Sequence, residues 1–382
     1  MVVQFITHYL NGNELRKIIF ADQLRGVAAI AVVIVHLCGG FWAWREEVAQ
    51  RIMAPVIVGP SSRFLDVVNL FNFGPFGVAI FFLISGFVIP MSLENLSPGR
   101  FLIARAFRIY PVYIVSLAIG LLAVWLSSRY WGTPFTLARE TILSNAFLVH
   151  GQALEPSIDF VNWTLAIEVK FYIVMAAATL FGLHRRPVGL VAVSAAILAG
   201  VLVVPPEYAA TTRTLCDLGF IPYMLVGTVF SMHMRGRING RHALSSILAL
   251  AGIFVACVFI WHVKQAPAPL TLDIYLPVIG VFAAAYAYRD QFRPNRLLDF
   301  LASISYPLYA VHCLLSFVLL RVFLDRGIPH LAALPATLVV IVAITYGLHR
   351  LVEKPTNRVG KWIVSNASRL QTQHHTHQTR AP

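Results

Sequence analysis

Charge is scarce in this chain of 382 residues. Asp, Glu, Lys and Arg make up 12% of the residues, whereas a soluble globular domain carries about 25%. Hydrophobic residues make up 58%. So little charge cannot cover a water-exposed surface, which excludes a soluble enzyme, and so much apolar content excludes a disordered chain. The composition instead indicates a protein embedded in a membrane.

Cysteine is also scarce, and its spacing does not suit a metal or disulfide site. The four cysteines, Cys38, Cys216, Cys257 and Cys313, lie in apolar segments without Cys-x-x-Cys spacing. They are interpreted as small buried hydrophobic residues, and no metal site is predicted. The net charge of +13 is spread through a hydrophobic chain. It therefore indicates membrane topology, with lipid as a partner and no nucleic acid.

Long apolar windows predict an all-α, polytopic membrane helix bundle with about ten transmembrane helices. Their approximate limits are 19–40, 71–91, 106–127, 159–183, 188–204, 215–234, 244–263, 270–288, 297–323 and 331–352. The apolar segment 141–150 is too short to cross a bilayer, so it is expected at the interface or packed on the outer side.

The basic residues predict that both termini are cytoplasmic. With the N-terminus inside, nineteen of the thirty Lys and Arg residues fall in cytoplasmic segments and nine in outer ones. This asymmetry favours that orientation because positively charged loops resist translocation. Residues 1–17 are then a cytoplasmic segment and 18–360 the transmembrane domain. Residues 361–382, rich in Ser, Gln, Thr and His, are predicted to be a disordered cytoplasmic tail.

The first span contains two ionisable residues, Arg25 and His36. An ionisable side chain inside a span costs roughly 2.5–3.5 kcal/mol, so each needs a partner, a wet cavity or a function. Eleven residues correspond to about 1100° of helical rotation, which places both side chains on one face, about 16 Å apart. An arginine reaching the headgroups and a hydrogen-bonded core histidine are the structural alternatives. Their shared face favours a functional pair.

Two arginines open the third span. Arg105 and Arg108 are three residues apart and therefore neighbours on a helix, so both can contact one phosphate-rich anion at the cytoplasmic surface. The alternative is that both contact lipid headgroups, where basic residues are expected in any case.

The fourth span places Glu168 among apolar residues. It needs a cationic or proton-bearing partner, such as His36 or an arginine, and a purely structural ion pair is the alternative. Lys170 is an unsuitable partner because residues two apart point to different faces of a helix.

The ninth span contains Pro307 between hydroxyl-bearing residues. A proline in a transmembrane helix frees backbone groups that a cavity can use. Ser305, Tyr309 and His312 share a face there and suggest a polar lining, although repair of the kink by hydrogen bonding is the alternative.

Taken in order, these segments resemble acyltransferase family 3, whose members move acyl groups onto hydroxyls of carbohydrates and natural products. The resemblance covers about residues 18–360. The motifs are Asp22-x-Leu-Arg25-Gly followed by His36, the block from Gly77 to Phe87, Arg105-x-x-Arg108-Ile-x-Pro111, Trp163-x-Leu-x-x-Glu168, Ile304-Ser-Tyr-Pro-Leu-Tyr-x-x-His312 and Glu353-x-Pro355. Thr164 stands where the family often has serine. The small residues of the block from Gly77 to Phe87, Ser85 among them, permit close helix approach and are interpreted as structural.

The resemblance implies acyl-CoA, with acetyl-CoA expected, as the donor substrate and no permanently bound cofactor. Arg25 and His36 match the family's active-site pair, and Arg105 and Arg108 match the residues directed toward the CoA phosphates. The acceptor is expected to be a cell-envelope carbohydrate or lipid-linked glycan at the inner (plasma) membrane. The sugar of a macrolide or another secondary metabolite is the alternative acceptor.

Two mechanisms are consistent with these residues. His36 can act as the general base toward the acceptor hydroxyl, or it can carry the acyl group as an acyl-histidine. Glu168 is expected to orient the imidazole, and Tyr306 or Tyr309 to donate to the oxyanion. The rivals from other classes are an anion transporter and a haem or quinone protein that uses His36 and His312.

Overall fold

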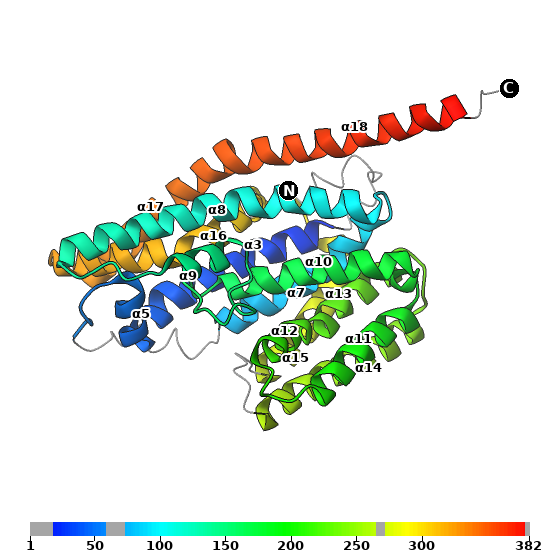
Figure 1. Cartoon of the computed structure of the whole chain (residues 1–382), viewed down its shortest axis with the longest axis horizontal. Helices are drawn as coiled ribbons and strands as arrows, with labels where there is room; N and C mark the ends of the chain where they lie inside the picture. The colour runs from blue at the N-terminus through cyan, green and yellow to red at the C-terminus, as the bar shows by residue number, and fades with distance from the viewer. Residues whose placement is uncertain (1–17, 59–72, 265–271, 379–382) are drawn as a thin grey trace.

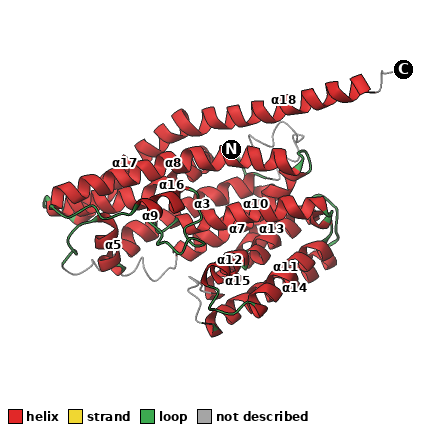
Figure 2. Cartoon of the chain, viewed as in Figure 1, coloured by secondary structure: helices red, strands yellow, loops and turns green. Residues whose placement is uncertain are grey.

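Helices account for all the regular structure in the described part of the chain (Figure 2). The computed structural model describes residues 18–58, 73–264 and 272–378, and the side chains up to residue 366. The predicted N-terminal segment 1–17 lies outside the described residues. In chain order the helices are α3 (Ile19–Ile34), η1 (Val35–Gly40, a π-helix), α4 (Phe41–Ala43), α5 (Arg45–Ile52), α7 (Phe73–Leu93), α8 (Pro98–Trp131), α9 (Arg139–Ala146), α10 (Asn162–Leu180), η2 (Leu183–Arg185), α11 (Pro187–Val203), α12 (Ala209–Leu218), α13 (Ile221–Met234), α14 (Gly240–Val263), α15 (Leu272–Ala287), η3 (Arg289–Gln291), α16 (Arg296–Asp325), α17 (His330–Leu348), η4 (His349–Glu353, a π-helix) and α18 (Lys354–Gln378).

The number of apolar helices agrees with the prediction. Within the described ranges, eight helical segments are long and apolar enough to cross a membrane, and α11 and α15 are shorter apolar helices. These two occupy the predicted windows 188–204 and 270–288. In a bilayer every backbone polar group needs an internal partner, and an α-helix supplies one for each residue in its interior. The chain is therefore an all-α, multi-pass membrane protein.

The boundaries differ from the apolar windows in two places. The predicted span 215–234 lies within two consecutive helices, α12 and α13, which meet at Gly219 and Phe220. At the C-terminus, composition predicts disorder from residue 361, whereas α18 continues as a helix to Gln378. The beginning of α18 packs on α8, where Gly360 lies against Phe107, and the helix then extends past the bundle (Figure 1). Composition alone does not reveal that this segment packs on α8 and continues from there as a helix.

Loops assigned to the same side of the membrane by the charge count lie together. On the predicted outer side, Arg51 after the first span donates a hydrogen bond to the carbonyl of Ser157, which precedes α10. On the predicted cytoplasmic side, Glu94 at the end of α7 pairs with Arg235 at the end of α13. The alternation of the spans is therefore geometrically consistent, while the orientation of the bundle remains a prediction from the basic residues.

The helix α7 lies at the centre of the bundle because its small residues permit close contact. It packs on α3, α13 and α15 (Figure 1). A Cβ at Gly77 would lie 2.8 Å from the carbonyl oxygen of Ala28 in α3. A Cβ at Gly86 would lie 1.6 Å from the carbonyl oxygen of Met224 in α13. The block from Gly77 to Phe87 thus packs helices closely, as its small residues predict.

Replacing Gly86 by alanine should prevent native packing, because the added methyl group overlaps a backbone oxygen that cannot move without shifting α13. We expect Gly86→Ala to lose more than about 3 kcal/mol of stability. Monodispersity and melting temperature in detergent measure the loss. Gly252→Ala is the matched control, because nothing lies within 4 Å of its added Cβ in α14. Equal melting temperatures for the two variants would contradict the close packing of α7 and α13.

Candidate active site

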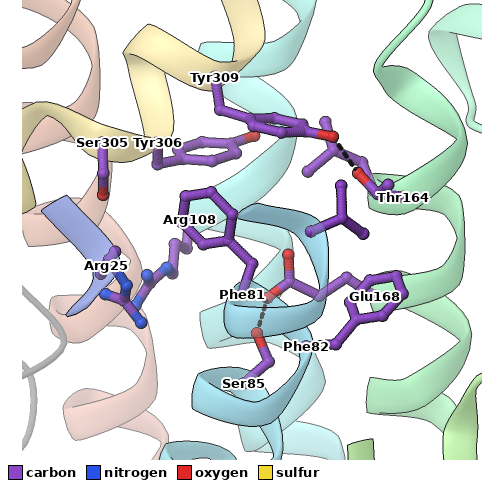
Figure 3. Close-up of a pocket in the computed structure, with 12 residues that line it drawn as sticks. Arg25, Phe81, Phe82, Ser85, Arg108, Thr164, Glu168, Ser305, Tyr306 and Tyr309 are labelled. Atoms are coloured by element: carbon purple, nitrogen blue, oxygen red, sulfur yellow. Dashed lines mark hydrogen bonds between the residues drawn. The ribbon is translucent and has the colours of Figure 1, made fainter. Parts of the chain in front are cut away.

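Five helices, α3, α7, α8, α10 and α16, surround a cavity inside the bundle (Figure 3). Its lining combines aromatic and aliphatic side chains with two arginines, a glutamate and five hydroxyls. The space open to water centres is about 60 Å³. Because one water needs roughly 10–15 Å³ on that measure, the cavity holds a few waters or one narrow chain. A polar lining at this depth marks a candidate site.

Arg25 from α3 and Arg108 from α8 bring two guanidinium groups to this cavity (Figure 3). Arg25 is 8% exposed, and neither arginine forms a hydrogen bond or ion pair with another residue in the described ranges. A buried cation without a carboxylate partner is costly, so such a pair is typical of a site that receives an anion.

Glu168 from α10 faces the same cavity, and its partners are hydroxyls. Ser85 and Tyr172 both donate hydrogen bonds to its Oε1, at 3.0 Å and 2.6 Å. Oε2 has no such bond within the described ranges, so one carboxylate oxygen remains directed to the cavity (Figure 3). Lys170 points away and pairs with Asp217 at 2.9 Å, as its position two residues from Glu168 predicts.

The hydroxyls of α16 are anchored to backbone carbonyls. Tyr306 lines the cavity, and its hydroxyl donates to the carbonyl of Ile109 at 2.6 Å. Tyr309 donates to the carbonyl of Val161 at 3.0 Å and lies 2.5 Å from Oγ1 of Thr164. Tyr309 and Thr164 thus form one buried hydroxyl pair, which closes the end of the cavity nearest α10 (Figure 3).

His36 lies outside the cavity lining, beyond Tyr309, and contacts His312. The rings of Tyr309 and His312 are 6.0 Å apart, and those of His36 and His312 are 5.0 Å apart. Nδ1 of His312 lies 3.0 Å from two carbonyl oxygens of its own helix, and its Nε2 lies 3.3 Å from Nδ1 of His36. Nδ1 of His36 also lies 2.7 Å from the carbonyl of Val32.

These contacts assign the protons of the histidine pair. A carbonyl only accepts, so Nδ1 of His312 carries a proton and its Nε2 offers a lone pair. Nδ1 of His36 then donates to Val32 and His312, which leaves the lone pair on Nε2 of His36. His36 also lies in the π-helix η1, an irregularity frequent at functional sites. The lone pair of Nε2 of His36 therefore has no hydrogen-bond partner among the described residues and is available to accept a proton.

Aromatic rings cover the opposite side of the histidine pair. Trp44 lies 6.4 Å from the ring of His36 and stacks on Phe160, with ring centroids 5.5 Å apart. Phe317 lies 6.2 Å from His36. The imidazole is therefore enclosed between Tyr309 and His312 on one side and these rings on the other.

The chain is similar in sequence to a known protein family over the residues that form this site. The model of acyltransferase family 3, described as an acyltransferase domain, matches residues 18–350, which include the cavity and the histidine pair. The chain belongs to acyltransferase family 3. It is therefore an acyltransferase that transfers groups other than aminoacyl groups.

Two curated proteins are similar to this acyltransferase over most of their length. The exopolysaccharide production protein ExoZ of Rhizobium meliloti (strain 1021) is 26% identical over 304 residues, which cover 76% of this chain and 92% of ExoZ. Nodulation protein 10 of Rhizobium leguminosarum bv. viciae is 26% identical over 339 residues, which cover 79% of this chain and 83% of that protein. No solved structure matches the acyltransferase significantly.

The structure brings together some of the predicted site residues of the acyltransferase and separates others. Arg25, Arg108, Glu168 and Tyr306 line one cavity, whereas His36 and Arg105 do not line it. Glu168 is predicted to contact His36, but in the structure it accepts a hydrogen bond from Ser85. The partner of His36 is instead His312. Helix rotation decides such partners, and spacing along one helix does not reveal it.

Arg105 has a different environment from Arg108. It is 3% exposed, donates to Oγ of Ser92 at 2.5 Å, and lies over the rings of Phe101 and Tyr172. It therefore ties α8 to α7 beside Tyr172, which in turn holds Glu168. The shared helical face of the two arginines is real, but only Arg108 reaches the cavity.

Two residues of the site have no predicted functional role in the sequence. Ser85 belongs to a block of small packing residues, and Thr164 differs from the family's usual serine only by a methyl group. His312 is predicted to be part of a polar lining, whereas in the structure it contacts His36. The signal that could have found them is the polar residue recurring within otherwise apolar helices.

The hydroxyl of Thr164 should matter because it holds Tyr309 beside the histidine pair. We expect Thr164→Val, which removes only that hydroxyl, to lower the acyl-transfer rate about tenfold, the usual effect of one lost buried hydrogen bond. Thr164→Ser keeps the hydroxyl and should retain the rate within about twofold. Initial rates in membranes containing equal amounts of each variant measure both. A fully active Thr164→Val enzyme would refute the role of this contact.

Proposed function

We propose that this acyltransferase transfers an acyl group, an acetyl group in the first instance, from cytoplasmic acyl-CoA to a hydroxyl of a cell-envelope carbohydrate at the inner membrane. The family and the names of its relatives support acyl transfer in polysaccharide production. The observation that carries the donor assignment is the pair of guanidinium groups of Arg25 and Arg108, which share a cavity without a carboxylate partner among the described residues.

The charge of the cavity suits an anionic donor. Two guanidinium groups face it and Glu168 contributes one carboxyl group, so its lining is positive overall. CoA carries several negative phosphate charges on one end and the acyl thioester on the other. Because arginine forks match phosphate oxygens, Arg108 and Arg25 attract the phosphate end.

The size of the cavity decides how much of the donor enters. About 60 Å³ open to water centres is too small for the nucleotide of CoA. The nucleotide therefore stays at the cytoplasmic mouth near Arg108, in the first third of α8, while the narrow pantetheine arm extends inward. The arm points its thioester toward Tyr309, which separates the cavity from the histidine pair.

His36 supplies the base for transfer. The acceptor hydroxyl gives its proton to Nε2 of His36 as its oxygen attacks the thioester carbonyl. The carbon–sulfur bond then breaks, and the CoA sulfur leaves with that proton as the thiol. While His36 is protonated, its Nδ1–H donates to Nε2 of His312 and to the carbonyl of Val32, which spreads the positive charge. His312 thus takes the orienting role expected of Glu168.

The hydroxyls above the cavity suit the oxyanion. Tyr306 and Tyr309 each donate a hydrogen bond to a backbone carbonyl. Of the two, Tyr309 lies nearer the histidine pair and is the better donor to an oxyanion that forms there.

The general-base role of His36 predicts that His36→Ala abolishes transfer. Loss of the base should lower kcat by at least about 100-fold, the range of general-base catalysis. Release of CoA thiol in the presence of isolated envelope carbohydrate measures the rate. Unchanged melting temperature in detergent controls for folding. Wild-type CoA release by a folded His36→Ala enzyme would remove the assignment.

The different environments of the two arginines predict different defects. Arg108→Ala should raise the KM for acetyl-CoA about tenfold with little change in melting temperature, because Arg108 reaches the cavity. Arg105→Ala should lower the melting temperature, because it removes the contacts with Ser92 and Tyr172.

Titration of acetyl-CoA at saturating acceptor separates the two effects. A KM for acetyl-CoA that stays at the wild-type value in Arg108→Ala, with an increase confined to the KM for acceptor, would contradict the docking of the donor phosphates.

A further inference from the structure

A second cavity lies on the other side of α10, toward the predicted outer face. Thr164, Leu165 and Glu168 face the first cavity, whereas Trp163 and Ala166 of the same helix face the second. Residues 150, 151 and 155–157 of the preceding loop, three residues of α12 and Phe220 complete its walls. Its space open to water centres is about 220 Å³, which is ample for a six-membered sugar ring.

A buried histidine lines this cavity. His150 is 7% exposed, and within the described part of the chain its Nδ1 has no hydrogen-bond partner. Burial lowers the pKa of His150 to about 4, so the ring is neutral near pH 7. A buried polar atom without a partner is costly, and such an atom in a cavity of this size suits a ligand that exchanges a hydrogen bond with it.

The remaining polar groups of the cavity balance one another in charge. Asp217 pairs with Lys170 at 2.9 Å. Glu155 accepts a hydrogen bond from Thr141 at 2.6 Å, and Arg213 adds a positive charge at the rim. The cavity therefore offers both hydrogen-bond donors and acceptors, and its positive and negative charges offset one another. This pattern suits a neutral ligand rich in hydroxyls better than a phosphate or a cation.

An aromatic wall completes the lining. Trp163 lines the cavity beside Phe220, with ring centroids 5.7 Å apart. Aromatic rings beside hydrogen-bonding groups suit the two kinds of surface on a pyranose, whose faces are apolar and whose rim carries hydroxyls.

One short loop separates this cavity from the histidine pair. Ser157 lines the cavity, and three residues later Phe160 stacks on Trp44, the ring beside His36. Arg51 holds the loop by donating to the carbonyl of Ser157 and by lying over the ring of Phe160 at 4.0 Å. A chain of sugar units seated in the cavity therefore needs to pass this loop and the ring of Trp44 to reach His36.

We propose that the cavity bounded by His150, Trp163 and Asp217 binds one sugar unit of a neutral oligosaccharide acceptor, while another unit of the same chain presents its hydroxyl to His36. This inference rests on the proposed function for the identity of the acceptor. It adds a binding site on the opposite side of α10 from the donor cavity, so the two substrates approach His36 from different sides.

Acceptor kinetics test the site. The probes are oligosaccharides released from the envelope polysaccharide of the source cells by mild acid and freed of esters by mild base. His150→Phe keeps an aromatic ring of similar size but loses the ring nitrogen. It should raise the KM for these oligosaccharides about tenfold, the effect of one lost hydrogen bond, and leave the KM for acetyl-CoA within about twofold. His150→Asn, whose amide can replace Nδ1, should recover part of the loss.

One further variant tests the same site, and another serves as a control. Arg213→Ala changes an exposed residue at the rim and should also raise the acceptor KM, so it applies even where His150→Phe fails to fold. His262→Phe makes the same exchange at an exposed position of α14 and should leave both KM values unchanged. Wild-type acceptor KM values in folded His150→Phe and Arg213→Ala, or an increase confined to the KM for acetyl-CoA, would overturn the site.

Binding measured without turnover distinguishes this inference from the proposed function. Saturation-transfer NMR with the same oligosaccharides should show binding to His36→Ala and loss of binding when His150→Phe is added. Binding that depends on His150 in a protein that acetylates no oligosaccharide would refute the proposed reaction and keep the site. Acetylation with binding unaffected by His150→Phe would refute the site and keep the reaction. Neither binding nor acetylation by the unmodified enzyme would overturn both.

Discussion

The need to keep two arginine side chains inside a helix bundle constrains the rest of this structure. Arg25 and Arg108 face one cavity, and among the described residues that line it only the hydroxyl-bound Glu168 offers an opposite charge. Desolvating a guanidinium group is costly, so the fold must supply a polar cavity around the pair. Five helices do so, and their backbones satisfy their own hydrogen bonds, which leaves the side chains available for the site.

Close helix contact makes that cavity possible. At Gly86 and Gly227 the backbones of α7 and α13 approach so closely that neither position has room for a Cβ. This contact fixes the position of α7, which carries Ser85 on its cavity-facing side. Ser85 in turn holds one oxygen of Glu168. Small residues that permit close packing thus help to determine where the carboxylate of Glu168 points in the cavity.

The helix α10 and the hydroxyl pair of Tyr309 and Thr164 divide the interior into compartments. The positive cavity lies on one side of them, the enclosed histidine pair lies beyond Tyr309, and a larger cavity of balanced charge lies across α10. Such a division suits a transfer between two chemically different substrates, because each compartment can match one of them. It also leaves His36 only 7% exposed, and exclusion of bulk water would limit hydrolysis in the proposed transfer.

The sequence by itself determined the membrane class, the set of about ten apolar helices, the close packing of the block from Gly77 to Phe87, and the family. Each of these follows from composition, window length or motif order, which are local properties of the chain. The polar residues of the site were also visible, because an ionisable group in an apolar helix stands out wherever its partner lies.

Only the tertiary structure decided which of those residues meet. Arg105 and Arg108 share a helix face, yet the rotation of α8 sends one to Ser92 and the other to the cavity. His36 meets His312 from a helix 276 residues away in sequence, and Glu168 meets Ser85. Spacing along one helix sets the relative direction of its own side chains, whereas the rotation and depth of a neighbouring helix depend on packing between segments far apart in the chain.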